Sequence, residues 1–120
     1  MGRELLGFVA MAKKIRVDSD ILALVHDFGL DAHLNTRFAA MSLGTQKKFM
    51  LSAAWIGDPA ALLLDEPSNG LDIDARIFLA QLFQEKGQRS TILFTTHDTD
   101  FVAATGAAVI TMDQVLARAY

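Results

Sequence analysis

Two adjacent acids end the most apolar run of this 120-residue chain. Asp65 and Glu66 directly follow Leu62–Leu64, and a proline and a short polar turn then lead to Asp72. Carboxylates at the carboxyl end of a buried strand can hold Mg²⁺, commonly through water, and can activate an attacking water molecule. The same residue types also suit plainer roles as helix caps or as solvated acids that end a strand. The elements around the pair therefore decide its interpretation.

A histidine follows the next apolar run at the corresponding position. His97 comes directly after Ser90–Thr96, so two neighbouring parallel strands would bring it close to the acidic pair. A histidine there can donate a hydrogen bond to a terminal phosphate oxygen or contact the attacking water. The other two histidines, His26 and His33, flank a predicted helix end with no third ligand at metal spacing. This pattern favours structural or solvent-facing roles for both of them.

Apolar residues at helical spacing predict two amphipathic helices near the start of the chain. The first covers Arg3–Ile15, and the second covers Ile21–Phe28 after capping residues in Val17–Asp20. Gly29 is expected to end the second helix in a left-handed conformation. Further helices are predicted over residues 42–56, 73–86, 97–106 and 113–120.

Three apolar runs without polar alternation are typical of parallel strands that are covered on both faces. They span Ala60–Asp65, Ser90–Thr96 and Ala107–Met112, and they alternate with the predicted helices. Such alternation implies right-handed crossovers and a parallel sheet flanked by helices. The predicted fold class is therefore α/β, with a sheet of three strands that is thin for a complete domain.

The composition narrows the classes of function. The chain has no cysteine, which excludes disulfides and thiolate metal sites. Its net charge of −3 argues against nucleic acid as a partner. No apolar run approaches the roughly 20 residues that span a bilayer, and basic residues follow the first apolar stretch, the reverse of a secretory signal. These features indicate a cytoplasmic chain, with Lys13–Lys14 and Lys47–Lys48 expected on solvated helix faces.

From Met41 onward, the order of motifs resembles the C-terminal half of the ATPase domain of ABC transporters, a P-loop NTPase fold. The matching segments are the signature loop at Ser42–Thr45, the Walker B strand at Leu62–Glu66, the D-loop at Ser68–Asp72 and the switch histidine at His97. The resemblance implies that residues 1–57 form part of the helical subdomain with the signature helix. Residues 58–120 would form the Walker B, D-loop and switch region of the core.

The resemblance implies a role for each residue at the strand ends. Asp65 would order Mg²⁺, and Glu66 would be the general base for the water that attacks the terminal phosphate of ATP. His97 would sense that phosphate. Asp72 would contact a second ATPase domain across a dimer.

The signature loop would bind the phosphate of the ATP molecule held by that second domain. Its residues are Ser42, Leu43, Gly44 and Thr45. The commonest form of the family motif has glycine at the position of Leu43 and glutamine at that of Thr45. Leucine at this position is familiar among exporter-like members, whereas threonine reaches less far than glutamine and would weaken the phosphate contact.

No phosphate loop of the form G-x-x-x-x-G-K-[ST] occurs in the chain, and the family's Q-loop is also absent. The resemblance therefore implies an ATP- and Mg²⁺-dependent subunit of an ABC transporter that lacks its Walker A half. Its partners would be that half, a second ATPase domain and transmembrane permease subunits at the cytoplasmic face of the membrane. Alone, the chain is expected to be inactive, to bind ATP weakly and to associate through apolar sheet surfaces.

Two alternatives remain open. One is a non-catalytic truncated fragment that only packs against a partner. The other is an ABC-type ATPase outside transport, in DNA repair, chromosome structure or translation. The repair and chromosome proteins carry long heptad arms or zinc-binding cysteines, and neither is present. The turn Ser68–Asp72 and the helices before it are more typical of transporters.

Overall fold

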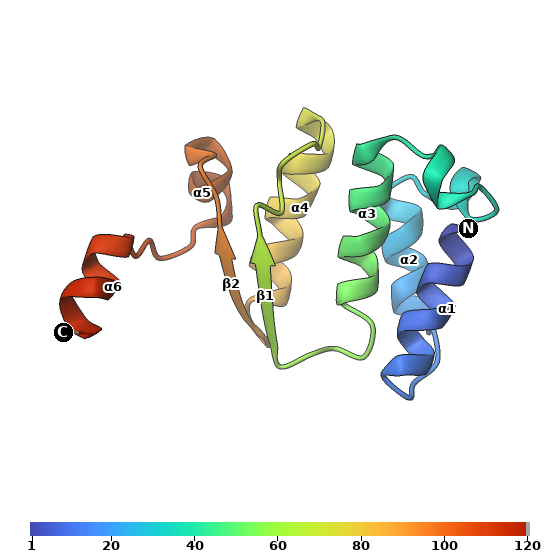
Figure 1. Ribbon diagram of the computed structural model, residues 1–120, viewed down its shortest axis with the longest axis horizontal. Helices are drawn as coiled ribbons and strands as arrows, with labels where there is room; N and C mark the ends of the chain where they lie inside the picture. The colour runs from blue at the N-terminus through green and yellow to red at the C-terminus, as the bar shows by residue number, and fades with distance from the viewer. Residues whose placement is uncertain (120) are drawn as a thin grey trace.

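The computed structural model describes residues 1–119, which form helices and one small sheet (Figure 1). The helices pack side by side along the longest axis, with the strands in front of α4 and with α6 standing apart from the rest (Figure 1). In chain order the elements are α1 (Gly2–Ala12), α2 (Ser19–Asp27), short 3₁₀ helices at Asp31–His33 and Phe38–Ala40, α3 (Leu43–Ala54), β1 (Ala61–Asp65), α4 (Ile73–Lys86), β2 (Thr91–Thr95), α5 (Thr99–Thr105) and α6 (Met112–Ala119).

Local capping chemistry determines where the helices begin. The Asp18 carboxylate accepts a hydrogen bond from the Ile21 amide at 3.0 Å and so starts α2. The Asp72 carboxylate does the same for α4 through the Ala75 amide, at 2.8 Å. Each such cap stabilises its helix by about 1 kcal/mol. Gly29 follows α2 with φ of 73°, which confirms the predicted left-handed helix end.

The sheet consists of two parallel strands. Residue Ala61 of β1 lies opposite Thr91 of β2, and the register continues to the pair Asp65 and Thr95. The crossover between the strands is α4, as the alternation of elements predicts. The α/β fold class is therefore confirmed.

The predicted third strand is wrong. Residues 107–111 have no regular structure, and α6 begins at Met112. Gly106 ends α5 with φ of 68°, and the chain then runs away from β2 (Figure 1). The Thr111 amide donates to the Gln114 side chain at 2.9 Å, and the Gln114 amide donates to the Thr111 hydroxyl at 3.2 Å. This reciprocal pair starts α6, close to the start of the helix that the sequence predicts over residues 113–120.

A single hydrophobic core joins helices α1 to α5 to one face of the sheet. Phe83 of α4 is its centre, with ring centroids 5.8 Å from Trp55, 5.2 Å from Phe94 and 5.6 Å from Phe101. Aromatic pairs at these separations add to the stabilisation that burial provides. Because Trp55 follows α3 and Phe94 lies in β2, this cluster connects the N-terminal helices to the sheet.

The opposite face of the sheet is open. Leu63 of β1 is 77% exposed and Leu93 of β2 is 60% exposed. The expectation of strands covered on both faces is therefore wrong for residues 1–119. The physical reason is that α4 and α5 pack on the face of Phe94, and no element of the described part packs on the other.

Candidate functional site

The two acids lie where β1 meets the turn that follows it. Asp65 is the last residue of β1, and its carboxylate accepts a hydrogen bond from the hydroxyl of Thr95, its partner in the register. The Glu66 amide donates to the Thr95 carbonyl oxygen at 3.0 Å. The end of β2 therefore contacts both acids.

Glu66 has a left-handed backbone, with φ of 48°. This conformation is uncommon for residues other than glycine and costs on the order of 1 kcal/mol unless the surroundings hold it. Its carbonyl oxygen accepts from the Asn69 amide at 3.1 Å and from the Lys47 ammonium at 2.8 Å. Hydrogen bonds from β2, from the following turn and from α3 therefore stabilise the left-handed backbone of Glu66.

A polar cleft of about 380 Å³ opens beside the ends of the strands. His97 Nε2 lies 3.6 Å from Glu66 Oε1 across this cleft, just beyond hydrogen-bond distance. The His97 side chain is 99% exposed, whereas that of Glu66 is 31% exposed. The histidine can therefore reach a ligand from the solvent side. The cleft is lined by Glu66, Ser68, Asn69, Gly70, Leu71, Arg76, His97 and Asp98.

An ion pair connects the loop that carries His97 to α4. Arg76 Nη1 lies 3.5 Å from Asp98 Oδ2, and the other Asp98 oxygen accepts from the Phe101 amide at 3.0 Å to start α5. The Asp98 amide donates to the Thr96 hydroxyl at 3.0 Å. These contacts fix the loop on both sides of His97 while leaving the imidazole itself in solvent.

The predicted signature loop, Ser42–Thr45, starts α3. The Ser42 hydroxyl accepts from the Thr45 amide at 3.1 Å and donates to the Thr45 hydroxyl at 2.9 Å. Leu43 is 80% exposed, so it contributes little to packing. A Cβ atom on Gly44 would lie 3.0 Å from the Gly70 carbonyl oxygen, which means that the first turn of α3 lies against the D-loop turn.

The described contacts do not join all of the candidate residues. Asp72 is exposed and caps α4 through the Ala75 amide. Within residues 1–119, no side-chain hydrogen bond or ion pair connects Asp72 or the signature loop to Asp65, Glu66 or His97. The polar link between α3 and the acidic pair is instead Lys47.

The expectation that both lysine pairs lie on solvated helix faces is wrong in part. Lys13 donates to the carbonyl oxygens of Ala54 and Ile56, at 3.2 and 2.8 Å, at the C-terminal end of α3. Lys47 is half-buried and donates to the Glu66 carbonyl. Their acceptors lie 19 or more residues away, and helical periodicity carries no information about such partners.

Asp65 and Glu66 supply the oxygen ligands that Mg²⁺ prefers, and Asp65 is exposed at the strand end. No group of three or more histidine, aspartate or glutamate side chains in the described chain is arranged to hold a metal ion. Magnesium sites that act on phosphates commonly use one or two carboxylates and complete their shell with water and phosphate oxygens. The donor set therefore fits Mg²⁺ that arrives with a nucleotide.

Comparison with known proteins identifies the family. A family model described as "AAA domain, putative AbiEii toxin, Type IV TA system" matches residues 4–103. The chain is 38% identical to the ABC transporter ATP-binding protein NatA of Bacillus subtilis over 69% of its own length and 34% of that protein. It is 33% identical to ABC transporter A family member 10 of Dictyostelium discoideum, over 83% of this chain and 11% of that protein.

The solved structures that resemble this chain are also ABC transporter proteins. The ATP-binding subunit of an ABC transporter superposes with a TM-score of 0.71 at 27% identity, over 84% of this chain and 44% of that one. An inward-facing metal-chelate type ABC transporter shares the fold with a TM-score of 0.60 at 20% identity. The chain spans less than half of the length of both curated relatives named above. The chain therefore belongs to this AAA-domain family, as part of an ATPase domain of the ABC transporter type.

Proposed function

We propose that this chain supplies the water-activating and metal-ordering side of an ATP-hydrolysing subunit that powers an ABC transporter. The observation that carries the proposal is the pair of Glu66 and His97 across the polar cleft, next to Asp65 at the end of β1. A base, a donor and a metal-binding carboxylate at the carboxyl ends of parallel strands are among the groups that hydrolysis of a terminal phosphate requires.

In this proposal each side chain has one role. Glu66 accepts a proton from the attacking water, and His97 donates to an oxygen of the terminal phosphate. Asp65, whose carboxylate also accepts a hydrogen bond from Thr95, would hold Mg²⁺. Bound Mg²⁺ supplies positive charge that stabilises the phosphate oxygens.

The remaining candidate residues act between domains. Ser42–Thr45 binds the phosphate of ATP held by a second ATPase domain, since α3 begins in this loop and the N-terminus of a helix attracts anions. Asp72 contacts that domain. We assign residues 1–57 to the helical subdomain with the signature helix and residues 58–120 to the core.

The chain also needs a polypeptide that carries the phosphate loop, because no such loop occurs in residues 1–120. None of the helices between Met1 and Ala119 combines the length and apolar character that crossing a bilayer requires. We infer that transmembrane permease subunits hold the complete domain at the cytoplasmic face of the membrane.

The test of this function is Glu66→Gln in the ATPase assembly that contains the chain. Loss of the general base should lower kcat by about 10²- to 10⁴-fold, with Mg-ATP still bound. Glu85→Gln is the matched control, because Glu85 is an exposed glutamate on α4 outside the cleft. Turnover and retained nucleotide should be measured for both variants. Equal turnover in Glu66→Gln and the unchanged assembly would remove Glu66 as the base.

A second candidate function is that of a non-catalytic fragment that packs against a partner. The lack of a phosphate loop favours it, since residues 1–120 contain no sequence of the form G-x-x-x-x-G-K-[ST], whose lysine reaches the β- and γ-phosphates. This candidate predicts that no assembly containing the chain depends on Glu66 for turnover, so the same experiment separates the two.

A further inference from the structure

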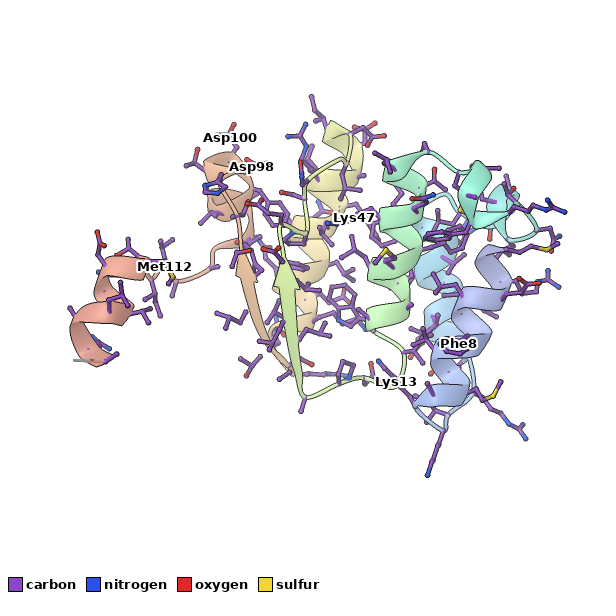
Figure 2. The ribbon with its side chains drawn as sticks, viewed as in Figure 1. Phe8, Lys13, Lys47, Asp98, Asp100 and Met112 are labelled. Carbon is purple, nitrogen blue, oxygen red and sulfur yellow. The ribbon has the colours of Figure 1, made fainter. Side chains whose placement is uncertain are left out.

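Lys47 reaches from α3 to the backbone at the end of β1. Its ammonium group donates to the Glu66 carbonyl oxygen at 2.8 Å, and the side chain extends from α3 toward the strands (Figure 2). The hydrogen bond is partly buried, and its donor carries a full charge. Charge-assisted hydrogen bonds of this kind are roughly twice as strong as neutral ones.

The acceptor of this hydrogen bond belongs to the most unusual residue of the cleft. With φ of 48°, Glu66 keeps its backbone only as long as neighbouring groups hold it, because a non-glycine residue is more stable at negative φ. The Asn69 amide is the other donor to this oxygen, but it comes from the turn that Glu66 itself begins. Lys47 is therefore the donor to this carbonyl that comes from a separate element.

The neighbouring lysine shows that the contact is specific to one position. Lys48 also lies on α3, yet its side chain makes no hydrogen bond or ion pair with the rest of residues 1–119. Gly44 brings the first turn of α3 against the turn at Gly70, so α3 approaches this region closely enough for a side chain at position 47 to reach Glu66.

We propose that Lys47 is a positioning residue, which holds the Glu66 backbone in its left-handed conformation and so keeps the Glu66 carboxylate opposite His97. The role of Glu66 as base in this inference rests on the proposed function. Through this bond, a movement of α3 changes the direction of the Glu66 carboxylate. The helix that begins with the signature loop is thereby connected to the group that activates water.

The hydrogen bond can be tested in the 120-residue chain without any nucleotide. The chain has two prolines, preceded by Asp58 and Glu66, so the pair Glu66–Pro67 is its only Glu–Pro sequence. Carbonyl-¹³C glutamate and ¹⁵N proline labels therefore give a single carbon-detected correlation, which reports the Glu66 carbonyl. Lys47→Met should shift this signal, and Lys48→Met should leave it unchanged. A signal that Lys47→Met does not move would overturn the proposal.

A measurement on the unchanged chain covers the case in which Lys47→Met does not fold. A hydrogen bond between the Lys47 ammonium and the Glu66 carbonyl produces a scalar coupling between the nitrogen and the carbonyl carbon. Its observation supports the contact, and its absence under conditions where the ammonium signal is resolved overturns it.

Kinetic measurements then distinguish a positioning role of Lys47 from a role in the stability of the fold alone. In the ATPase assembly, Lys47→Met should lower kcat about 10- to 100-fold with KM for ATP unchanged, since a small displacement of a catalytic group has effects of this size. Lys47→Arg keeps the charged donor and should restore part of the rate, whereas Lys48→Met should match the unchanged assembly. If Glu66→Gln abolishes turnover but Lys47→Met does not lower it, the inference on Lys47 fails alone. If Glu66→Gln also has no effect, the proposed function fails.

Discussion

Single residues at the strand ends combine two tasks. Asp65 ends β1 and accepts a hydrogen bond from Thr95, and it is also the metal ligand of the proposed function. Glu66 both starts a left-handed turn and directs a carboxylate into the cleft. Because one peptide carries the strain and the candidate base, a substitution at Glu66 is informative only when the backbone is kept, as in glutamine.

Outside the cleft, the ion pair between His26 and Asp31 predicts a dependence on pH. Hydrogen bonding to Asp31, and then the charge of Asp31, raise the pKa of His26 above its ordinary value, with a smaller contribution from Asp27. The folded-state pKa is the raised one. The stabilisation by protonated His26 is therefore fully present below the unfolded-state pKa of about 6.5 and is lost as pH rises through the folded-state pKa.

Replacing Asp31 with asparagine should lower the pKa of His26 toward its ordinary value. The imidazole signals of His26 in an NMR titration measure this change. Asp20→Asn serves as the control, because Asp20 does not contribute to the pKa shift of His26. A pKa of His26 that is the same in Asp31→Asn and in the unchanged chain would contradict the prediction.

Among the elements, α3 has the central position. Lys13 donates hydrogen bonds to carbonyl oxygens at the C-terminal end of α3, and Lys47 of α3 donates one to the Glu66 carbonyl oxygen. The first turn of α3 lies against Gly70. The helix also packs against α1 and α2. One helix is therefore in contact with both the N-terminal helices and the cleft.

Gly44→Ala tests the close approach at the start of α3. The new Cβ would lie 3.0 Å from the Gly70 carbonyl oxygen, so the D-loop turn must move slightly. Gly7→Ala is the control, because a Cβ at Gly7 of α1 meets no atom within 4 Å. Alanine should raise the free energy of unfolding by up to about 1 kcal/mol at Gly7, and by less or not at all at Gly44. Thermal unfolding of both variants gives this difference, and equal gains would contradict the close approach.

At the scale of the whole molecule, the most consequential feature is the exposed apolar face of the sheet. Leu63 and Leu93 lie exposed side by side in the parallel register, and both strands have a free edge. Exposed apolar faces and unpaired strand edges favour association.

Leu93→Lys should therefore weaken self-association of the 120-residue chain. A charge in the middle of the open face makes its burial against another molecule unfavourable. Leu22→Lys is the comparison, since Leu22 is an exposed leucine on α2, away from the sheet. Light scattering as a function of concentration measures the effect, and equal changes in the two variants would show that the sheet face is not the contact.

The features that depend on neighbours in the chain could be predicted from the sequence. The caps at Asp18 and Asp72, the left-handed Gly29 and the bounds of α4 follow from local hydrogen bonding and periodicity. Residues 107–111 could not be predicted in the same way, because an apolar run becomes a strand only when it pairs with a neighbouring strand, and after Gly106 the chain runs away from β2 (Figure 1).

The same distinction applies to the site. The polar residues at the strand ends are visible in the sequence, because parallel strands end at one edge of a sheet. Thr95 could have been found as the residue opposite Asp65 in that register. The contacts of Lys47 and Arg76 join elements that are distant in the chain, and no local pattern reveals them.

The separate position of α6 makes the chain convenient for spectroscopic labelling. No residue of α6 is buried, and its first residue, Met112, lies well away from the cleft (Figure 2). Since the sequence has no cysteine, Ala117→Cys would introduce a single thiol on an exposed helix. A fluorophore at this position would report assembly with other chains without disturbing the residues that line the cleft.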